Sequence, residues 1–124
     1  MTKFVYGCFA FEFSYDLRRR RRTAPNTAIA DNAPTQNMGD IAVDWDSETI
    51  WIGTGESNSS RSSYAGVGVL KSMDKGKTWT NVGLTDSHHI GRVVINKNNT
   101  NEVIVGVVGH LYTSNSERGI FKTV

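Results

Sequence analysis

Several residue types are scarce in this chain of 124 residues, and each shortage excludes a class of protein. The one cysteine, Cys8, cannot form a disulfide within the chain. Two prolines are too few for a collagen-like or proline-rich linker protein. The sequence has no run of about 18 apolar residues and so contains no transmembrane segment. A hydrophobic content of 38% with 12 glycines is ordinary for one globular domain, which excludes wholesale disorder.

The excess of basic charge is confined to one end of the chain. Residues 1–30 hold six basic and two acidic side chains, whereas residues 31–124 hold eight and ten. The excess comes from the run Arg18 to Arg22, which has no interleaved aromatic or glycine residue. We interpret this run as a solvated linker, with a tether to nucleic acid or another anionic surface as the alternative. The mildly acidic remainder argues against a nucleic-acid partner.

The N-terminal segment has a pattern of its own. Aromatic side chains occupy every second position from residue 9 to residue 15, which predicts a strand with one aromatic face. A secretory signal is the alternative, but Glu12 interrupts the apolar region and no clear cleavage site follows. We expect residues 3–15 to cover a sheet edge, and residues 1–37 to form an atypical segment that continues as an arginine-rich linker.

An internal repeat relates two parts of the remaining chain. Matched blocks recur at offsets of 52, 53 and 51 residues: Gly39–Val43 with Gly91–Ile95, Ile50–Gly53 with Val103–Gly106, and Gly68–Ser72 with Gly119–Thr123. The blocks keep the same order, and the small drift in offset is what loop insertions and deletions produce. The sequence therefore contains two copies of one structural unit.

Each block is short and rich in β-branched residues, as strands are. We expect strands at residues 40–44, 49–54, 66–72, 77–82, 90–95, 102–108 and 118–123. No segment shows the apolar period of a helix. Four short strands in each unit of about 50 residues is the pattern of a β-propeller blade. The predicted fold class is all-β, a partial β-propeller of about one and three-quarter four-stranded antiparallel blades.

This expected propeller domain occupies residues 38–124, with a blade at 38–88 and an incomplete blade at 89–124. The second unit stops where its fourth strand would begin. Because a closed propeller typically takes about 4–8 blades, we expect the chain to be a fragment that needs further blades or a second chain.

The turn between the third and fourth expected strands carries a motif. Residues 72–79 read Ser-Met-Asp-Lys-Gly-Lys-Thr-Trp and match every fixed position of Ser-x-Asp-x-Gly-x-Thr-Trp. An aspartate can accept backbone N–H bonds across such a turn, and a glycine supplies the positive φ that the turn needs. We interpret the motif as a structural hairpin staple, formed by Ser72, Asp74, Gly76, Thr78 and Trp79.

This motif resembles the Asp box, or bacterial neuraminidase repeat. Together with Ile50–Glu56, Asp86–Arg92 and Gly109–Leu111, it makes residues 33–124 resemble secreted bacterial sortilin-like or glycosyl-hydrolase-like Asp-box propellers. The resemblance implies a multi-bladed propeller in a secreted or cell-surface protein, with sorting-receptor ectodomains and xyloglucan-hydrolysing enzymes as distant relatives. Two features depart from the pattern: the second unit has no complete box, and residues 1–30 do not look like a preceding blade.

Three acidic residues are candidates for glycosidase chemistry, which needs two carboxylates that flank the scissile bond. They are Asp40, Glu56 and Asp86, near strand ends or in loops. In the alternative interpretation, Asp40 and Asp86 satisfy backbone groups of turns and Glu56 is solvated. A sialidase would also need an arginine cluster for its substrate carboxylate, and the arginines of residues 38–124 share no motif.

The three histidines give little reason to expect a metal ion. His88 and Glu56 could supply two ligands, but the sequence shows no third ligand and no Cys/His spacing typical of zinc. We therefore expect neither a metal nor a cofactor. Of the adjacent His88 and His89, we expect one to point inward with a hydrogen bond and the other to lie at the mouth of a loop.

The long connection at residues 56–66 is a candidate binding surface, because loops on a rigid sheet often carry ligand contacts. We expect Arg61, Tyr64 and His88 to contact a peptide or sugar, with a flexible serine-rich loop as the alternative. The predicted function is a non-catalytic repeat module that displays loops for protein or glycan binding. The alternative is a fragment of a xyloglucanase-like or sialidase-like glycoside hydrolase whose active site needs absent blades.

Overall fold

The computed structural model describes residues 28–58 and 60–123, so the expected strand at residues 3–15 and the arginine run lie outside the described residues. Within these ranges the chain forms strands and no helix, which confirms the all-β class. The strands are β1 (Met38–Asp44), β2 (Thr49–Thr54), β3 (Val69–Ser72), β4 (Thr80–Asn81), β5 (Ile90–Ile95), β6 (Val103–Val107) and β7 (Gly119–Lys122). None of the described residues belongs to a helix that could span a membrane.

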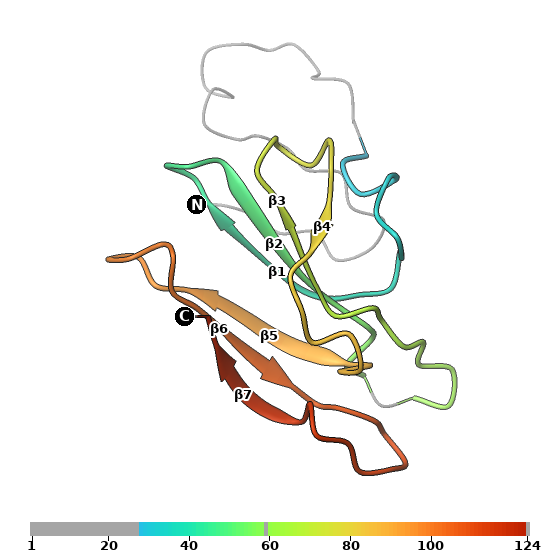
Figure 1. Ribbon diagram of the computed structural model, residues 1–124. Helices are drawn as coiled ribbons and strands as arrows, with labels where there is room; N and C mark the ends of the chain where they lie inside the picture. The colour runs from blue at the N-terminus through green and yellow to red at the C-terminus, as the bar shows by residue number, and fades with distance from the viewer. Residues whose placement is uncertain (1–27, 59, 124) are drawn as a thin grey trace.

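The strands form two antiparallel sheets in which consecutive strands are neighbours, in the orders β1-β2-β3-β4 and β5-β6-β7 (Figure 1). Both sheets have a register shift at the same place. It lies just before Asp40, which pairs with Gly53, and just before Arg92, which pairs with Gly106. These two pairs are equivalent in the sequence repeat. The second sheet therefore repeats the strand pairing of the first.

The observed strands differ from the expected ones mainly at their ends. Those expected at residues 49–54 and 90–95 are confirmed. Those expected at residues 66–72 and 77–82 are shorter, as β3 and β4. β3 starts only after Gly68, whose φ of 105° interrupts the extended chain, and the first expected residues of β4 belong to the preceding turn.

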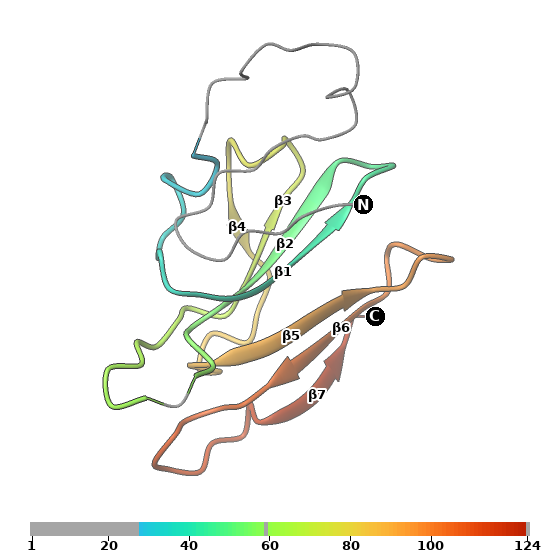
Figure 2. The ribbon, with the colours of Figure 1, turned by 180° about the vertical axis from the view of Figure 1, so that it is seen from behind.

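The two sheets pack against each other through one apolar face of each (Figures 1 and 2). Their shared core contains Trp51 and Val69 from the first sheet and Ile90, Val93, Val103, Val105 and Val107 from the second. Alternation along β6 directs every second residue, Val103, Val105 and Val107, into this core, whereas Ile104 is exposed. The second sheet therefore has one buried face and one open face.

The first sheet is covered on its other face as well. Ile50, Ile52 and Leu70 are buried there, and Ile29 packs against them. Trp79 also packs on this face, and its indole Nε1 donates a hydrogen bond of 3.1 Å to the carbonyl of Ile29. Part of the segment that we expected to be linker thus forms a cover for the sheet.

The turn from β3 to β4 has the hydrogen bonds that the motif predicts. Asp74 Oδ1 accepts from the Thr78 N–H at 2.9 Å, and Asp74 Oδ2 accepts from the Thr78 hydroxyl at 2.7 Å. Ser72 Oγ donates to Asp74 at 2.8 Å and accepts from the Gly76 N–H at 2.8 Å. The bonds from Thr78, followed by that from Ser72, lower the pKa of Asp74 to about 2. Gly76 has a φ of 86°, as expected.

Candidate functional site

Three connections gather at one end of the two sheets. They span residues 55–68 between β2 and β3, residues 82–89 between β4 and β5, and residues 108–118 between β6 and β7 (Figure 1). The Gly66 N–H donates to the His88 carbonyl at 2.7 Å and joins the first two connections. The Val108 N–H donates to the His89 carbonyl at 2.8 Å and joins the second to the third. The turn between β3 and β4, residues 73–79, lies at the opposite end of the first sheet (Figure 1), and we call it the Asp-box turn after the motif that it resembles.

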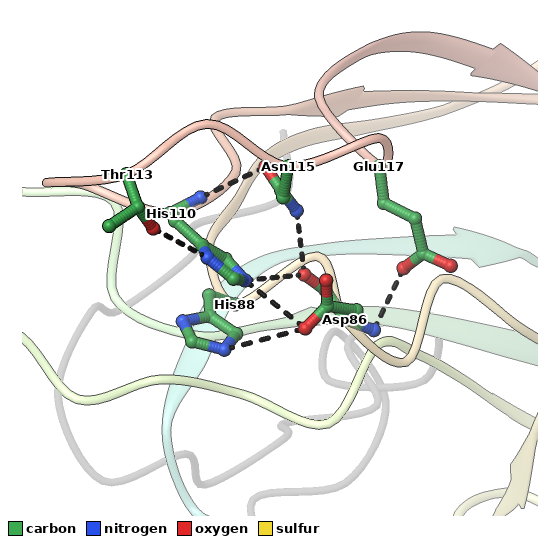
Figure 3. A network of polar contacts seen from close by, with 6 residues as sticks. All are labelled: Asp86, His88, His110, Thr113, Asn115 and Glu117. Atoms are coloured by element: carbon green, nitrogen blue, oxygen red, sulfur yellow. Dashed lines mark hydrogen bonds and ion pairs between the residues drawn. The ribbon is translucent and has the colours of Figure 1, made fainter.

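Asp86, His88 and His110 meet between the second and third of these connections (Figure 3). Each offers one ligand atom, and these atoms all lie within 4.8 Å of one another. His110 Nε2 lies 3.1 Å from Asp86 Oδ1, and His88 Nε2 lies 3.8 Å from the same oxygen. The two imidazole rings stack with centroids 3.7 Å apart and planes inclined by 29°. We call these three residues the His–Asp cluster.

Hydrogen bonds from the β6–β7 connection hold the cluster (Figure 3). His110 Nδ1 lies 2.9 Å from the hydroxyl of Thr113. The Asn115 side-chain amide donates to the Asp86 carbonyl at 2.8 Å, and the Glu117 carboxylate accepts from the Asp86 N–H at 2.8 Å. Neighbouring groups therefore orient one histidine and the backbone of the aspartate.

Unusual backbone conformations shape both connections. Gly109 has a φ of 79°, and a Cβ there would stand 2.6 Å from Asn115 Oδ1, so the turn before His110 requires glycine. Leu84 and His88 also have positive φ, of 55° and 54°, a region in which side chains are disfavoured. These two bends lie on either side of Asp86.

The cluster is open to solvent. The exposed fraction of the side chain is 57% for Asp86, 40% for His88 and 21% for His110. Two imidazoles and one carboxylate are a donor set suited to a transition-metal ion, and their exposure leaves room for a further ligand. The sequence suggested Glu56 as a second ligand beside His88 and showed no third, whereas the structure groups His88 with Asp86 and His110.

The other two candidate acids lie apart from the cluster. Asp40, on β1, points at the second sheet: its Oδ2 accepts from the Val93 N–H at 2.8 Å and lies 3.8 Å from Arg92 Nε. Glu56 is the second residue of the β2–β3 connection, and its N–H donates to the Tyr64 carbonyl at 3.1 Å. Asp40 thus satisfies a backbone group, as in the alternative interpretation, although that group belongs to a neighbouring strand.

The candidate binding residues Arg61 and Tyr64 are both exposed on the β2–β3 connection. This connection has internal order, since the Ser60 N–H donates to Ser63 Oγ at 2.9 Å and the Ser63 N–H to the Ser60 carbonyl at 3.2 Å. His88 lies on the next connection, so two neighbouring connections at one end of the sheets carry the three residues.

The adjacent histidines separate as expected. His89 is buried and His88 lies at the loop end. The predicted hydrogen bond of the inward histidine is absent at Nδ1 among the described residues, and the buried hydroxyl of Ser87 likewise has no partner there. The hydrogen bond that we expect of the inward histidine therefore stays a prediction for its other ring nitrogen, Nε2.

The cluster could have been anticipated from strand pairing. Ile90 pairs with Val107, so the residues just before β5 lie beside those just after β6. His88 and His110 occupy those positions.

None of the protein-family models, curated proteins or solved structures with which the chain was compared matches the chain. The resemblance to Asp-box propellers therefore comes from the motif and the repeat alone and stays a prediction.

Proposed function

We propose that the chain contributes two neighbouring blades to an Asp-box β-propeller, and that this module binds a protein or glycan through its loops without catalysing a reaction. The proposal depends on a comparison between the two sheets of this chain. The positions through which the first sheet packs on the second recur, by the sequence repeat, on the open face of the second sheet. A secreted or cell-surface location belongs to the same proposal.

Exposure of the side chains at equivalent positions differs between the two sheets. Trp51 and Val69 face the second sheet and are 6% and 3% exposed. Ile104 and Ile120 stand at the equivalent positions of the second sheet, with exposed fractions of 43% and 82%. The second sheet thus presents to solvent the kind of face that the first sheet buries. A third sheet could pack on this open face in the way that the second sheet packs on the first. Such a third sheet would extend the stack, as successive blades do in a propeller.

The edge of the second sheet supports the same proposal. In the first sheet β3 pairs with β4, for example Leu70 with Asn81. Its counterpart β7 pairs only with β6 among the described residues. A fourth strand would complete the second blade and protect this edge. Further blades or a second chain would supply both that strand and the next sheet.

Two features favour binding over catalysis. The Asp40 carboxylate bonds to the second sheet and the Asp86 carboxylate lies against His110, whereas a glycosidase needs two carboxylates that flank the scissile bond. The β2–β3 connection presents Arg61 and Tyr64 at the loop end, where a rigid scaffold commonly displays ligand contacts. A glycoside hydrolase whose active site requires other blades is the second candidate.

Binding of immobilised glycans and secreted proteins by the full chain tests the proposal. We expect a ligand whose affinity falls at least about tenfold in Tyr64→Ala, because exposed aromatic side chains are common binding anchors. Met73→Ala, which removes an exposed apolar side chain at the opposite end, is the matched control. Release of sugar from xyloglucan or a sialoside that is abolished by Glu56→Gln would instead favour the hydrolase.

A further inference from the structure

We propose that the His–Asp cluster, Asp86, His88 and His110, binds one divalent transition-metal ion of the zinc class. The remaining coordination positions of the ion would face solvent. This site shares His88 with the loops proposed to bind a protein or glycan, but neither the motif nor the repeat implies it.

The spacing of the donor atoms fits such an ion. Bonds of about 2.0–2.1 Å to zinc at tetrahedral angles separate neighbouring ligand atoms by about 3.3–3.4 Å. The distances from Asp86 Oδ1 to His110 Nε2 and His88 Nε2, 3.1 and 3.8 Å, lie on either side of that value. The donor atoms are therefore close enough to share one ion, although the His88 ring has to change its orientation to do so.

The chemistry of the donors selects the class of metal. Calcium and magnesium prefer shells composed of oxygen atoms, whereas two imidazoles and one carboxylate suit zinc and its neighbours. Structural zinc sites in proteins usually have four protein ligands. Three protein ligands leave at least one position open, so the ion could hold water or an oxygen of a bound molecule.

Outer contacts prepare His110 as a ligand. When its Nδ1–H donates to the Thr113 hydroxyl, at 2.9 Å, the lone pair of Nε2 is free and points to Asp86. Asn115 and Glu117 hold the backbone of Asp86 on both sides of its Cα. This pattern, with the second ring nitrogen of the ligand in a hydrogen bond, is usual for metal-binding histidines.

His88 has to move when the ion binds. Two rings stacked at 3.7 Å cannot both direct an Nε2 lone pair at one ion between them. The His88 side chain is the more exposed of the two, so it can rotate while His110 stays in its hydrogen bonds. Binding would therefore open the stack and change the environment of the His88 ring.

Calorimetric titration of the tag-free, chelator-treated full chain with ZnCl₂ tests the site. We expect one Zn²⁺ per chain, with affinity at least about tenfold weaker in His88→Asn and in Asp86→Asn, since even the loss of an outer contact commonly costs that much. Asparagine tolerates the positive φ of His88, so the first variant keeps its backbone conformation. Glu56→Gln and Cys8→Ser are controls that should bind as the wild type does.

A shift of the His88 imidazole resonances on addition of Zn²⁺, absent in His110→Ala, would support the site by a second measurement. Two results would overturn it. One is a chain with the circular dichroism of a β protein that takes up no Zn²⁺. The other is equal uptake by the wild type, His88→Asn and Asp86→Asn, which would place the ion elsewhere.

Discussion

Asp40 Oδ2 accepts a hydrogen bond of 2.8 Å from the backbone N–H of Val93, across the boundary between the two sheets. The Asp40 side chain is only 11% exposed, and Val93 belongs to the core that the sheets share. The sheets are therefore held together by a directional polar bond in addition to apolar packing. This bond explains why an aspartate occupies a strand that is otherwise half-buried.

Replacement of Asp40 by alanine should leave the Val93 N–H without its acceptor. We expect the free energy of unfolding to fall by about 1–3 kcal/mol, the usual cost of an unsatisfied buried donor. Asp40→Asn keeps a side-chain oxygen and should lose less. Urea denaturation measures both, with Asp46→Ala, on the exposed β1–β2 turn, as the control. Equal midpoints for Asp40→Ala and Asp46→Ala would show that the bond contributes nothing.

The Asp-box turn should make stability depend on pH in the acid range. Because hydrogen bonds from Thr78 and Ser72 lower the pKa of Asp74 from 3.8 to about 2, the carboxylate stabilises the fold above pH 3.8. That contribution is lost as the pH falls through about 2. Asp74→Asn should lower the urea midpoint clearly at pH 6 and much less near pH 2. A difference that is the same at both pH values would contradict the role of these bonds.

Gly76 and Gly83 both have positive φ, but only one of them lies close to another residue. Comparing an alanine variant at each position shows how much crowding lowers the free energy of unfolding. At Gly76 a Cβ would stand 2.7 Å from Ile29 Cβ, whereas at Gly83 it would meet nothing within 4 Å. Gly76→Ala should therefore destabilise the protein more than Gly83→Ala does, by about 1–3 kcal/mol, the usual cost of overpacking. Thermal unfolding of the two variants measures the difference. Equal losses would mean that Ile29 does not cover the Asp-box turn.

Much of the fold could be predicted because its signals are local. Strands at residues 49–54 and 90–95 follow from short β-branched runs, and the hydrogen bonds of Asp74 follow from the fixed residues of its turn. The short β4 was harder to predict, since its expected first residues belong to that turn. Local patterns do not show how far a turn extends into the following strand.

The candidate cluster was missed because its residues meet only through strand pairing. Asp86 and His110 are 24 residues apart, and the β5–β6 pair brings them together. The bond from Val93 to Asp40 spans 53 residues and two sheets, so no local pattern encodes it. Repeats predict which positions are equivalent, but the contacts between units depend on how the sheets pack.

In the proposed propeller, the open face of the second sheet takes a further sheet as its partner. Sedimentation equilibrium of the full chain tests it most directly, because an unpartnered apolar face tends to associate. We expect the wild type to self-associate as its concentration rises, and the double variant Ile104→Lys, Ile120→Lys to remain monomeric and folded. Tyr112→Lys, which removes an exposed aromatic side chain outside this face, should associate as the wild type does. A wild-type chain that stays monomeric at every concentration, indistinguishable from the double variant, would contradict the claim.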